Sequence, residues 1–399
     1  MVATRKWNVL DGNLDLPALV LKERELTNNI DVMATYCRKH GVDLAPHGKT
    51  SMAPQLFERQ IDAGAWGITA ATVSQCRTMR FFGVPRILLA NEVVDAQGIN
   101  WVLDEIERSG GDFEFLCYVD SHAGIEIIEH VVRSRTTPGR VHVLVELGYP
   151  GGRTGCRSVA EALALAERVA ASRALELCGV AGFEGLMPGV GADDVIEAID
   201  TYLGKLQTLV RAVQAAELCA EGEVVVSAGG SAYFDRVVAL LAPTRFDFPV
   251  RTILRGGCYI THDAEMYELT SPLGGRPGSG QHLLRPALEL WASVWSRPTP
   301  DLAILGFGKR DSPYDYRLPV PQAVRKVGAN ESRSVRGAFR VLDLNDQHAF
   351  VQIPVDDPLE VGDRVACGVS HPCGAFDKWS YIPVVDSDYT VIDGIFTFF

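Results

Sequence analysis

The sequence predicts an α/β protein in which a (β/α)₈ TIM barrel is joined to a second, mostly β domain. Two observations predict the barrel. Strand-like runs alternate with helix-like segments from residue 17 to about 260, and these runs are apolar throughout, as expected of parallel strands buried on both faces. A third observation predicts the second domain, because short β-like runs split by turn signals follow after about residue 265.

The barrel is expected to span residues 23–264. A helix-like stretch at 23–40 follows a β-like run at 17–22, and later amphipathic segments are clearest at 158–173 and 193–219, whereas the link between the last two strands is irregular. The eight strand-like runs are 43–49, 67–72, 86–92, 113–120, 141–148, 177–185, 223–230 and 251–257. Eight such units fit a closed barrel better than an open sheet, although spacing alone leaves a doubly wound sheet as an alternative.

The second domain is expected to combine residues 1–22 with residues 265–399. A loop rich in Gly, Pro and Ser at 271–281 opens its C-terminal part. Short β-like runs follow at 302–308, 348–355, 363–370 and 389–399.

Composition narrows the class of protein. The 399 residues carry a formal net charge of -12, which argues against nucleic acid and an anionic membrane surface as partners. No apolar run approaches the roughly 20 residues of a membrane span, and the N-terminus shows no secretory signal. The nine cysteines include no CxxC pair, which suits free thiols in a reducing cytosol. We therefore expect a cytoplasmic protein.

A lysine stands where the first barrel strand ends, in "PHGKT" (46–50). Functional groups of such barrels lie at the C-terminal ends of the strands, so Lys49 is a candidate for covalent catalysis through its amine. The alternative is a solvated lysine at a strand end.

Glycine turns end the last two strands, in "SAGGS" (227–231) and "RGGCY" (255–259). Their backbone N–H groups can approach an anion closely, and phosphate sites in these barrels often follow strands seven and eight. Two ordinary tight turns are the alternative. After the fifth strand, "GGRTGCR" (151–157) presents Arg153, either as a surface arginine or as a charge beside an anionic ligand.

A candidate metal site lies in "SHPCGAFDKW" (370–379). In an extended chain His371 and Cys373 would face the same way, and an imidazole with a thiolate favours zinc. Pro372 indicates an edge strand or a loop. Two ligands suit an open site completed by substrate and water, although a packed cysteine beside an unrelated histidine remains the alternative.

Four motifs together carry a resemblance: "LAPHGKTSMAPQ", "SAGGSAYFD", "LRGGCYITHD" and "SHPCGAFDKW". In this order they resemble the fold-type III pyridoxal-phosphate enzymes of the D-serine dehydratase and D-threonine aldolase family, nearly from end to end. The resemblance implies an alanine-racemase-like barrel, bound pyridoxal 5'-phosphate and a divalent metal, Zn²⁺ or Mn²⁺. It also implies a homodimer.

The resemblance assigns roles residue by residue. Lys49 matches the Schiff-base lysine, Arg153 resembles an arginine close to the pyridoxal ring, and His371 and Cys373 match the metal pair. The remaining cofactor residues, which match the phosphate-binding turns, are Gly229, Gly230, Ser231, Gly257, Cys258 and Tyr259. Glu184 and Asp377 are acidic residues near the expected mouth to which no role is assigned.

The implied activity is a lyase acting on small D-3-hydroxy amino acids. The histidine–cysteine pair followed by "FDKW" resembles the dehydratase branch, which eliminates water and releases a 2-oxo acid and ammonia. Gly374 and Ala375 stand where "TT" is expected, which leaves retro-aldol cleavage to glycine and an aldehyde as the alternative. A non-catalytic cofactor-binding protein would lack the second domain with its histidine–cysteine pair, and a racemase would need no metal.

Overall fold

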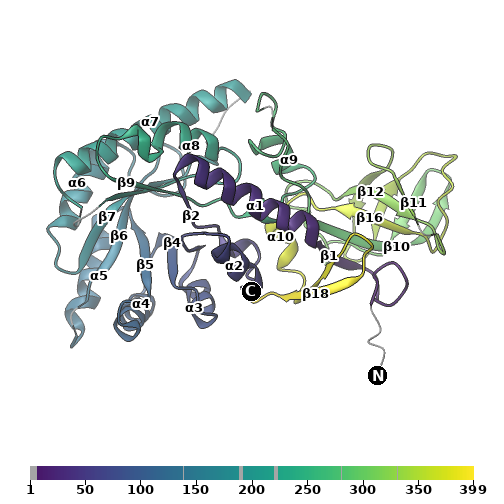
Figure 1. Ribbon diagram of the computed structural model, residues 1–399, viewed down its shortest axis with the longest axis horizontal. Helices are drawn as coiled ribbons and strands as arrows, with labels where there is room; N and C mark the ends of the chain where they lie inside the picture. The colour runs from purple at the N-terminus through teal and green to yellow at the C-terminus, as the bar shows by residue number, and fades with distance from the viewer. Residues whose placement is uncertain (1–6, 138, 188–191, 220–222, 280, 330) are drawn as a thin grey trace. The chain divides into compact units, whose positions relative to one another are not determined.

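The computed structural model describes residues 7–399 except 138, 188–191, 220–222, 280 and 330 (Figure 1). The chain forms two compact units. The barrel unit consists of Ala34–Lys49 and Phe57–Gly257, and the second unit consists of the chain up to Met33, Thr50–Leu56 and Cys258–Phe399. The domain boundaries expected from the sequence stay a prediction.

Eight parallel strands form the sheet of the barrel unit, in the spatial order β2-β9-β8-β7-β6-β5-β4-β3. Their bounds are β2 Asp43–Leu44, β3 Ile68–Ala70, β4 Arg86–Glu92, β5 Glu114–Val119, β6 Val141–Leu147, β7 Leu175–Gly182, β8 Val224–Ser227 and β9 Val250–Leu254. A parallel bridge joins His47 to Thr69, and the Thr69 N–H donates to the Pro46 carbonyl at 2.9 Å, so the sheet curls until its two edges meet. The predicted barrel is confirmed.

Helices lie outside this sheet (Figure 1). Their bounds are α1 Glu23–His40, α2 Pro54–Asp62, α3 Val73–Phe81, α4 Ala96–Ser109, α5 His122–Ser134, α6 Val159–Ala170, α7 Ala192–Ala215 and α8 Phe234–Leu241. Four of them begin after a polar residue whose side chain accepts a hydrogen bond from a backbone N–H of the first turn: Thr72, Asp95, Ser121 and Ser158. Each cap satisfies one otherwise unpaired N–H and sets where the strand-to-helix loop ends.

The link between the last two strands differs from the sequence prediction, because it contains the helix α8 rather than irregular chain alone. Phe234, Val237, Val238 and Leu241 are buried along one face of this helix. An eight-residue helix with apolar residues three and four positions apart is too short to produce a strong periodic signal. Packing against the barrel therefore stabilises a helix that periodicity did not predict.

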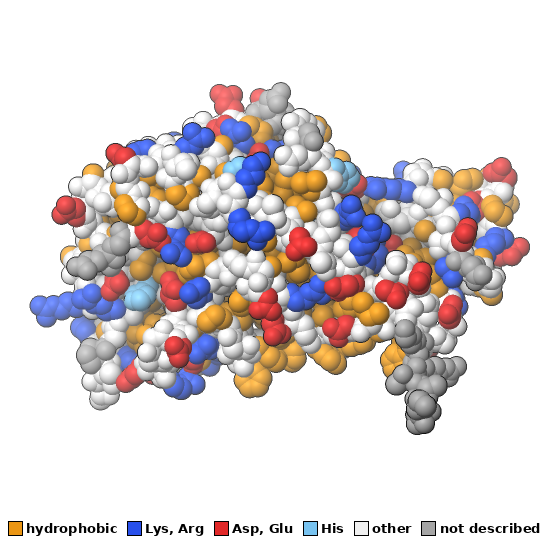
Figure 2. Space-filling view, viewed as in Figure 1, with side chains coloured by type: hydrophobic (Ala, Val, Ile, Leu, Met, Phe, Trp, Pro, Cys, Tyr) orange, Lys and Arg blue, Asp and Glu red, His pale blue; other side chains and the backbone are white. Residues whose placement is uncertain are grey.

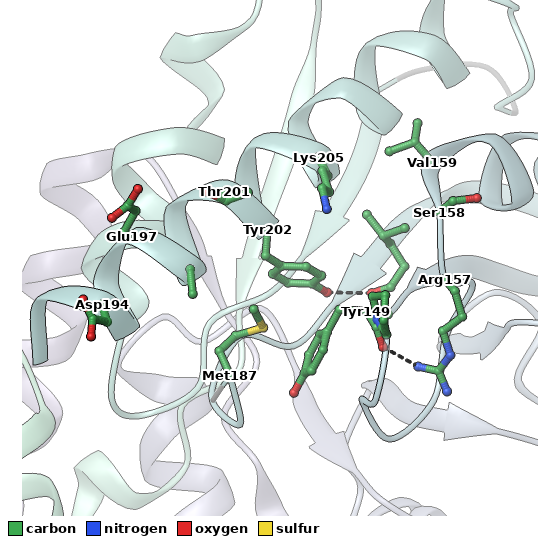
Figure 3. A pocket seen from close by; sticks show the side chains of 14 residues that line it. Tyr149, Arg157, Ser158, Val159, Met187, Asp194, Glu197, Thr201, Tyr202 and Lys205 are labelled. Carbon is green, nitrogen blue, oxygen red and sulfur yellow. Dashed lines mark hydrogen bonds between the residues drawn. The ribbon is translucent and has the colours of Figure 1, made fainter. Parts of the chain in front are cut away.

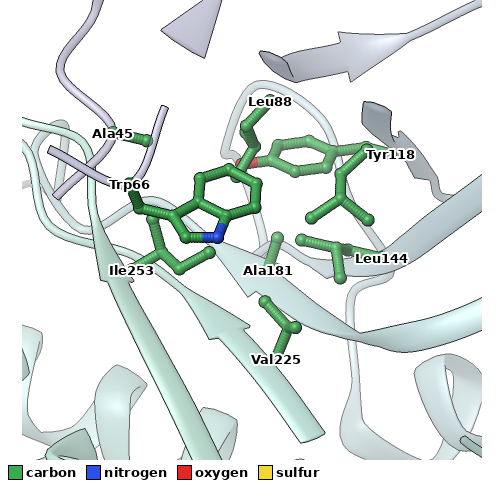
Figure 4. Close-up of a cluster of buried hydrophobic side chains, with 9 residues drawn as sticks. Ala45, Trp66, Leu88, Tyr118, Leu144, Ala181, Val225 and Ile253 are labelled. Carbon is green, nitrogen blue, oxygen red and sulfur yellow. The ribbon is translucent and has the colours of Figure 1, made fainter. Parts of the chain in front are cut away.

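Buried side chains on the barrel strands, or next to them, pack together in the interior of the barrel (Figure 4). The cluster comprises Ala45, Trp66, Leu88, Leu116, Tyr118, Leu144, Ala181, Val225 and Ile253, all buried. The barrel is therefore a packed core rather than a pore, and functional groups must lie at its ends.

The second unit is built on a ten-stranded, mostly antiparallel sheet, as predicted for a mostly β domain. The bounds are β1 Ala18–Lys22, β10 Leu288–Thr299, β11 Leu302–Leu305, β12 Val320–Arg325, β13 Ser332–Ser334, β14 Arg340–Leu344, β15 Ala349–Gln352, β16 Arg364–Gly368, β17 Tyr381–Val385 and β18 Val391–Phe396. Two short helices accompany it, α9 Met266–Thr270 and α10 Cys373–Phe376. The N-terminal strand β1 pairs with both β10 and β17, so the two ends of the chain share one sheet.

Acidic and basic side chains are interspersed over the face shown in Figure 2. Among the described helices, none combines the length and the apolar composition that a membrane span requires. Neither observation identifies a ligand, so the site has to be built from individual side chains.

Candidate active site

Lys49 lies five residues after the end of β2, in a 3-10 turn formed by Gly48–Thr50. The turn is held tightly because a Cβ on Gly48 would lie 2.5 Å from Cε of Met79 and 2.7 Å from Cγ2 of Ile68. The Lys49 side chain itself is exposed. The strand predicted to run to the lysine is shorter, ending at Leu44, and a 3-10 turn carries Lys49 instead.

Three positive charges act on His47, two residues before the lysine. Burial lowers the pKa of His47 well below its usual value, and the charges of Lys49, Arg255 and Arg153 lower it further. The imidazole is therefore neutral at physiological pH. Its Nδ1 is buried without a hydrogen-bond partner. The charges of two predicted site residues, Lys49 and Arg153, thus act on the same imidazole as the charge of Arg255.

Arg255 is the buried member of this cationic group, with 3% of its surface exposed. One guanidinium nitrogen donates to Oγ of Ser227 at 2.8 Å and another to the Gly182 carbonyl at 2.7 Å, while Nε has no partner. The guanidinium also lies 5.9 Å from the centre of the Tyr118 ring, whose hydroxyl is buried and unpartnered. A buried charge with spare donors is arranged to meet an anion or an acceptor atom.

The two glycine turns lie side by side, because the Arg255 N–H donates to the Gly229 carbonyl at 2.8 Å. A buried carboxylate already occupies two of the predicted anion donors: Glu184 accepts from the Gly229 N–H at 3.1 Å and from the Gly230 N–H at 2.8 Å. The predicted phosphate role of the two glycines stays a prediction.

Three carboxylates meet at the ends of β4, β5 and β6. One carboxylate oxygen from each of Glu92, Asp120 and Glu146 lies within 4.8 Å of the others. Burial, together with the neighbouring charge of Glu146, raises the pKa of Glu92 to about 7. The sequence did not single out these residues, although all three stand at strand ends. They supply negative charge at the same end of the barrel as the cationic group.

A cavity in the barrel unit lies apart from these residues (Figure 3). Its volume is about 610 Å³, and it is lined by the loop after β6 and by α7, including Tyr149, Arg157 and Lys205. None of the predicted site residues lines it. A cavity of about 20 Å³ next to it includes Arg153, Glu146 and Phe183. We assign the candidate site to the strand-end cluster, because cavity size carries no chemistry of its own.

In the second unit, the chain is helical from Cys373 on, so the extended backbone expected there was wrong, whereas Pro372 lies in a turn, in keeping with the predicted loop. Pro372 has φ -60° and ψ -37°, and α10 begins at the next residue. Proline suits the first turn of a helix because its φ is preset and its missing N–H has no partner there. The two side chains nevertheless meet: their hydrogen bond raises the pKa of His371 to about 9.

Further groups converge on this pair. Nδ1 of His371 lies 2.7 Å from Oδ2 of Asp315, and Sγ of Cys373 lies 3.4 Å from Sγ of Cys258 and 3.3 Å from Oγ1 of Thr50. These hydrogen bonds, the one to Cys258 first, lower the pKa of Cys373 well below its usual value. An imidazole oriented by a carboxylate, together with a stabilised thiolate, is a fit donor group for a divalent metal.

The comparisons with known proteins follow the division of the chain. The alanine racemase N-terminal domain matches residues 22–249, and the putative serine dehydratase domain matches residues 287–385. The chain belongs to the alanine racemase N-terminal domain family. With the second match, the resemblance stated from the sequence is confirmed at the level of the domains: the chain combines an alanine racemase N-terminal domain with a segment similar to the putative serine dehydratase domain, and its curated relatives are named aldolases.

Among curated relatives, 3-hydroxy-D-aspartate aldolase of Paracoccus denitrificans (strain Pd 1222) is 24% identical over 90% of this chain and 86% of its own. D-threonine aldolase of an Arthrobacter species is 26% identical over 75% of this chain and 73% of its own. The solved structure of D-threonine aldolase from Filomicrobium marinum superimposes with a TM-score of 0.78 at 23% identity, covering 96% and 95%. The solved structure of D-threo-3-hydroxyaspartate dehydratase from Delftia sp. HT23 superimposes with a TM-score of 0.73 at 21% identity, covering 96% of this chain and 98% of that one.

Sequence reasoning missed several residues of the site. Glu184 was noticed but given no role, and Arg255 stood unremarked inside "RGGCY". His47 stood within the quoted "PHGKT", where a histidine two residues before a strand-end lysine was a usable signal. Asp315 left no such signal, because its partner His371 lies 56 residues away in the chain.

Proposed function

We propose that this protein is a pyridoxal-phosphate- and divalent-metal-dependent lyase that acts on D-3-hydroxy amino acids by eliminating water, yielding a 2-oxo acid and ammonia. The observation that carries the proposal is the presence in one chain of two complementary groups. One is a strand-end lysine in a cationic group with Arg153 and Arg255, and the other is an imidazole–thiolate pair at His371 and Cys373.

The residues of the barrel unit fit the cofactor. Lys49 would bind the aldehyde group of pyridoxal phosphate. Arg153 and Arg255 would face the anionic oxygens or the ring nitrogen of the cofactor, because both arginines carry a permanent positive charge. The buried unpartnered Nε of Arg255 and Nδ1 of His47 are polar atoms that a bound ligand could satisfy. When bound, pyridoxal phosphate supplies an electron sink for the bond that breaks at Cα.

The chain's own residues then have defined tasks. Nζ of Lys49 would accept the proton from Cα of the substrate. The neutral His47 adds no further positive charge next to that amine. Asp315 holds the ring of His371 through Nδ1, which leaves Nε2 directed elsewhere. A metal on His371 and Cys373 would supply Lewis acidity to the 3-hydroxyl group, which leaves with a proton as water.

Retro-aldol cleavage to glycine and an aldehyde is the second candidate, because the two curated relatives described above are named aldolases. The same lysine and the same metal pair would serve both reactions, which differ in whether the Cα–H or the Cα–Cβ bond is aligned for cleavage.

The test is product identification. Purified holoenzyme is incubated with D-serine, D-threonine, D-phenylserine and D-threo-3-hydroxyaspartate, with and without a chelator. Formation of a 2-oxo acid and ammonia supports the dehydration proposal. Formation of glycine and an aldehyde overturns it in favour of retro-aldol cleavage. If the chelator changes neither product nor rate, the metal role of His371 and Cys373 is wrong. If no substrate is consumed, the proposed function fails. The expected homodimer is checked separately by light scattering.

A further inference from the structure

Cys258 was expected from the sequence to contribute only its backbone to a phosphate-binding turn. Its side chain has a different environment: it is buried, with 4% of its surface exposed, and its Sγ lies 3.4 Å from Sγ of Cys373. Thr50 closes the group from a third segment, with Oγ1 3.3 Å from Sγ of Cys373 and 4.0 Å from Sγ of Cys258. Two thiols distant in the chain are thus held together within one compact unit.

We propose that Cys258 is a third protein ligand of the divalent metal, so that the site is formed by His371, Cys373 and Cys258. This inference rests on the proposed function, because it adds a ligand to the metal site assigned there.

The sulfur–sulfur distance supports this assignment. Two thiolates that bind one tetrahedral Zn²⁺, each at about 2.3 Å, lie about 3.8 Å apart. The observed 3.4 Å differs from that separation by a few tenths of an ångström, whereas a disulfide would require about 2.05 Å. A small adjustment of one side chain would therefore let both sulfurs bind the same ion.

The histidine is prepared for the same role. Asp315 accepts or shares the proton at Nδ1 of His371, which leaves Nε2 as the nitrogen for a metal. Gly374 lies close to the same segment, because a Cβ at that position would lie 3.1 Å from Cβ of Pro313 and 3.4 Å from Oδ1 of Asp315. Glycine, at one of the two positions where "TT" is expected, therefore relieves a tight contact with Pro313.

A third ligand changes the expected metal and its chemistry. Two thiolates and one imidazole select Zn²⁺ over Mn²⁺, because thiolates are soft ligands. Three protein ligands leave one position of a tetrahedral site for water or for the substrate hydroxyl, as in catalytic zinc sites.

The experiment uses pyridoxal-phosphate-loaded protein, kept reduced and freed of metal, then reconstituted with Co²⁺ alone or Zn²⁺ alone. Thiolate-to-cobalt charge transfer in the near ultraviolet grows with the number of thiolate ligands. Cys258→Ser is expected to lose about half of this absorbance, and its Zn²⁺ affinity, measured by chelator competition, is expected to fall about 10-fold or more. Cys367→Ala, which removes a buried thiol in β16 of the same unit, is the matched control and should change neither.

The possible outcomes separate the two proposals. If Cys258→Ser keeps the charge-transfer intensity and Zn²⁺ affinity of the parent while His371→Ala and Cys373→Ala lose metal, only the third-ligand inference is overturned. If the parent protein binds neither ion stoichiometrically, the metal role in the proposed function fails as well. The visible absorbance of the cofactor and the circular dichroism of Cys258→Ser report whether the variant is folded. Should it misfold, alkylation of the parent decides: protection of both thiols by Zn²⁺ supports the inference, and protection of Cys373 alone overturns it.

Discussion

The two functional groups of this protein are built from opposite chemistry. The barrel unit gathers positive charge around a neutral imidazole at its strand ends, through Lys49, Arg153 and Arg255. The second unit gathers two thiols and a carboxylate-oriented imidazole, through Cys258, Cys373 and His371. The first group suits an anionic ligand with oxygen atoms, and the second suits a soft cation. Since neither group would bind the other's ligand well, the difference indicates two separate ligands.

The two groups also differ in how they are held. The lysine stands on a turn next to a glycine that has no room for a side chain, and a buried carboxylate, Glu184, fastens a neighbouring turn. The thiol group joins three segments of the chain through side-chain contacts among Thr50, Cys258 and Cys373. We therefore expect single substitutions to separate cofactor binding from metal binding.

The largest effect is expected for Lys49→Ala. Without its amine the cofactor has no covalent attachment and the Cα proton has no base, so activity should fall about 10³-fold or more. The visible absorbance of the bound cofactor should disappear, while metal content stays unchanged. Lys205→Ala, which removes a lysine lining the large cavity of Figure 3, is the control. Persistence of the absorbance in Lys49→Ala would remove the lysine from the site.

Glu184→Ala should be next, through stability of the barrel. It leaves the buried Gly229 N–H and the part-buried Gly230 N–H without their acceptor, which should lower the free energy of unfolding by about 2 kcal/mol. Urea unfolding followed by circular dichroism measures the change. Asp377→Ala removes an exposed carboxylate and should shift the midpoint little. An equal shift for both variants would contradict a structural role for Glu184.

Asp315→Asn should weaken metal binding about 10- to 100-fold, because a neutral amide orients His371 less firmly. The cofactor absorbance should be unaffected, which sharpens the separation between the two groups. Metal affinity is measured by chelator competition, with Asp311→Asn, in the same segment, as the control. A loss of cofactor together with metal would show that the two groups are not independent.

The smallest effect concerns pH. The pKa of Glu92 is raised from 4.5 to about 7, so the folded chain retains a proton that the unfolded chain releases between those values. The stability contributed by this group is therefore greatest at low pH and is lost as the pH rises from about 4.5 towards and beyond 7. Allowing for solvent screening, Glu92→Gln should remove about 1 kcal/mol of the loss in stability between pH 5 and pH 8. Parallel thermal melts at the two pH values test this, and an unchanged loss would contradict the raised pKa.

The fold was largely readable from the sequence, because strand order, strand burial and the polar helix caps are local properties. All eight barrel strands lie within the predicted runs or overlap them, and the capping residues mark where several helices begin. β10, the long strand Leu288–Thr299, was not singled out, since its apolar run includes Ser293, Ser296 and Arg297 and no clear alternation. The helix α8 and the helical turn at Pro372 depend on packing that a single sequence does not display.

By itself, the sequence determined the barrel, the mostly β second domain, the family and the positions that could carry chemistry, because each is encoded in neighbouring residues or in motif order. Only the tertiary structure decided which of those positions meet. It joined Cys258 to Cys373 across 115 residues and Asp315 to His371 across 56. It also brought the carboxylate of Glu184 to accept hydrogen bonds from the N–H groups of Gly229 and Gly230, 45 and 46 residues away. Such contacts arise when the chain folds in three dimensions, and the separation of two distant residues along the sequence does not show whether they will meet.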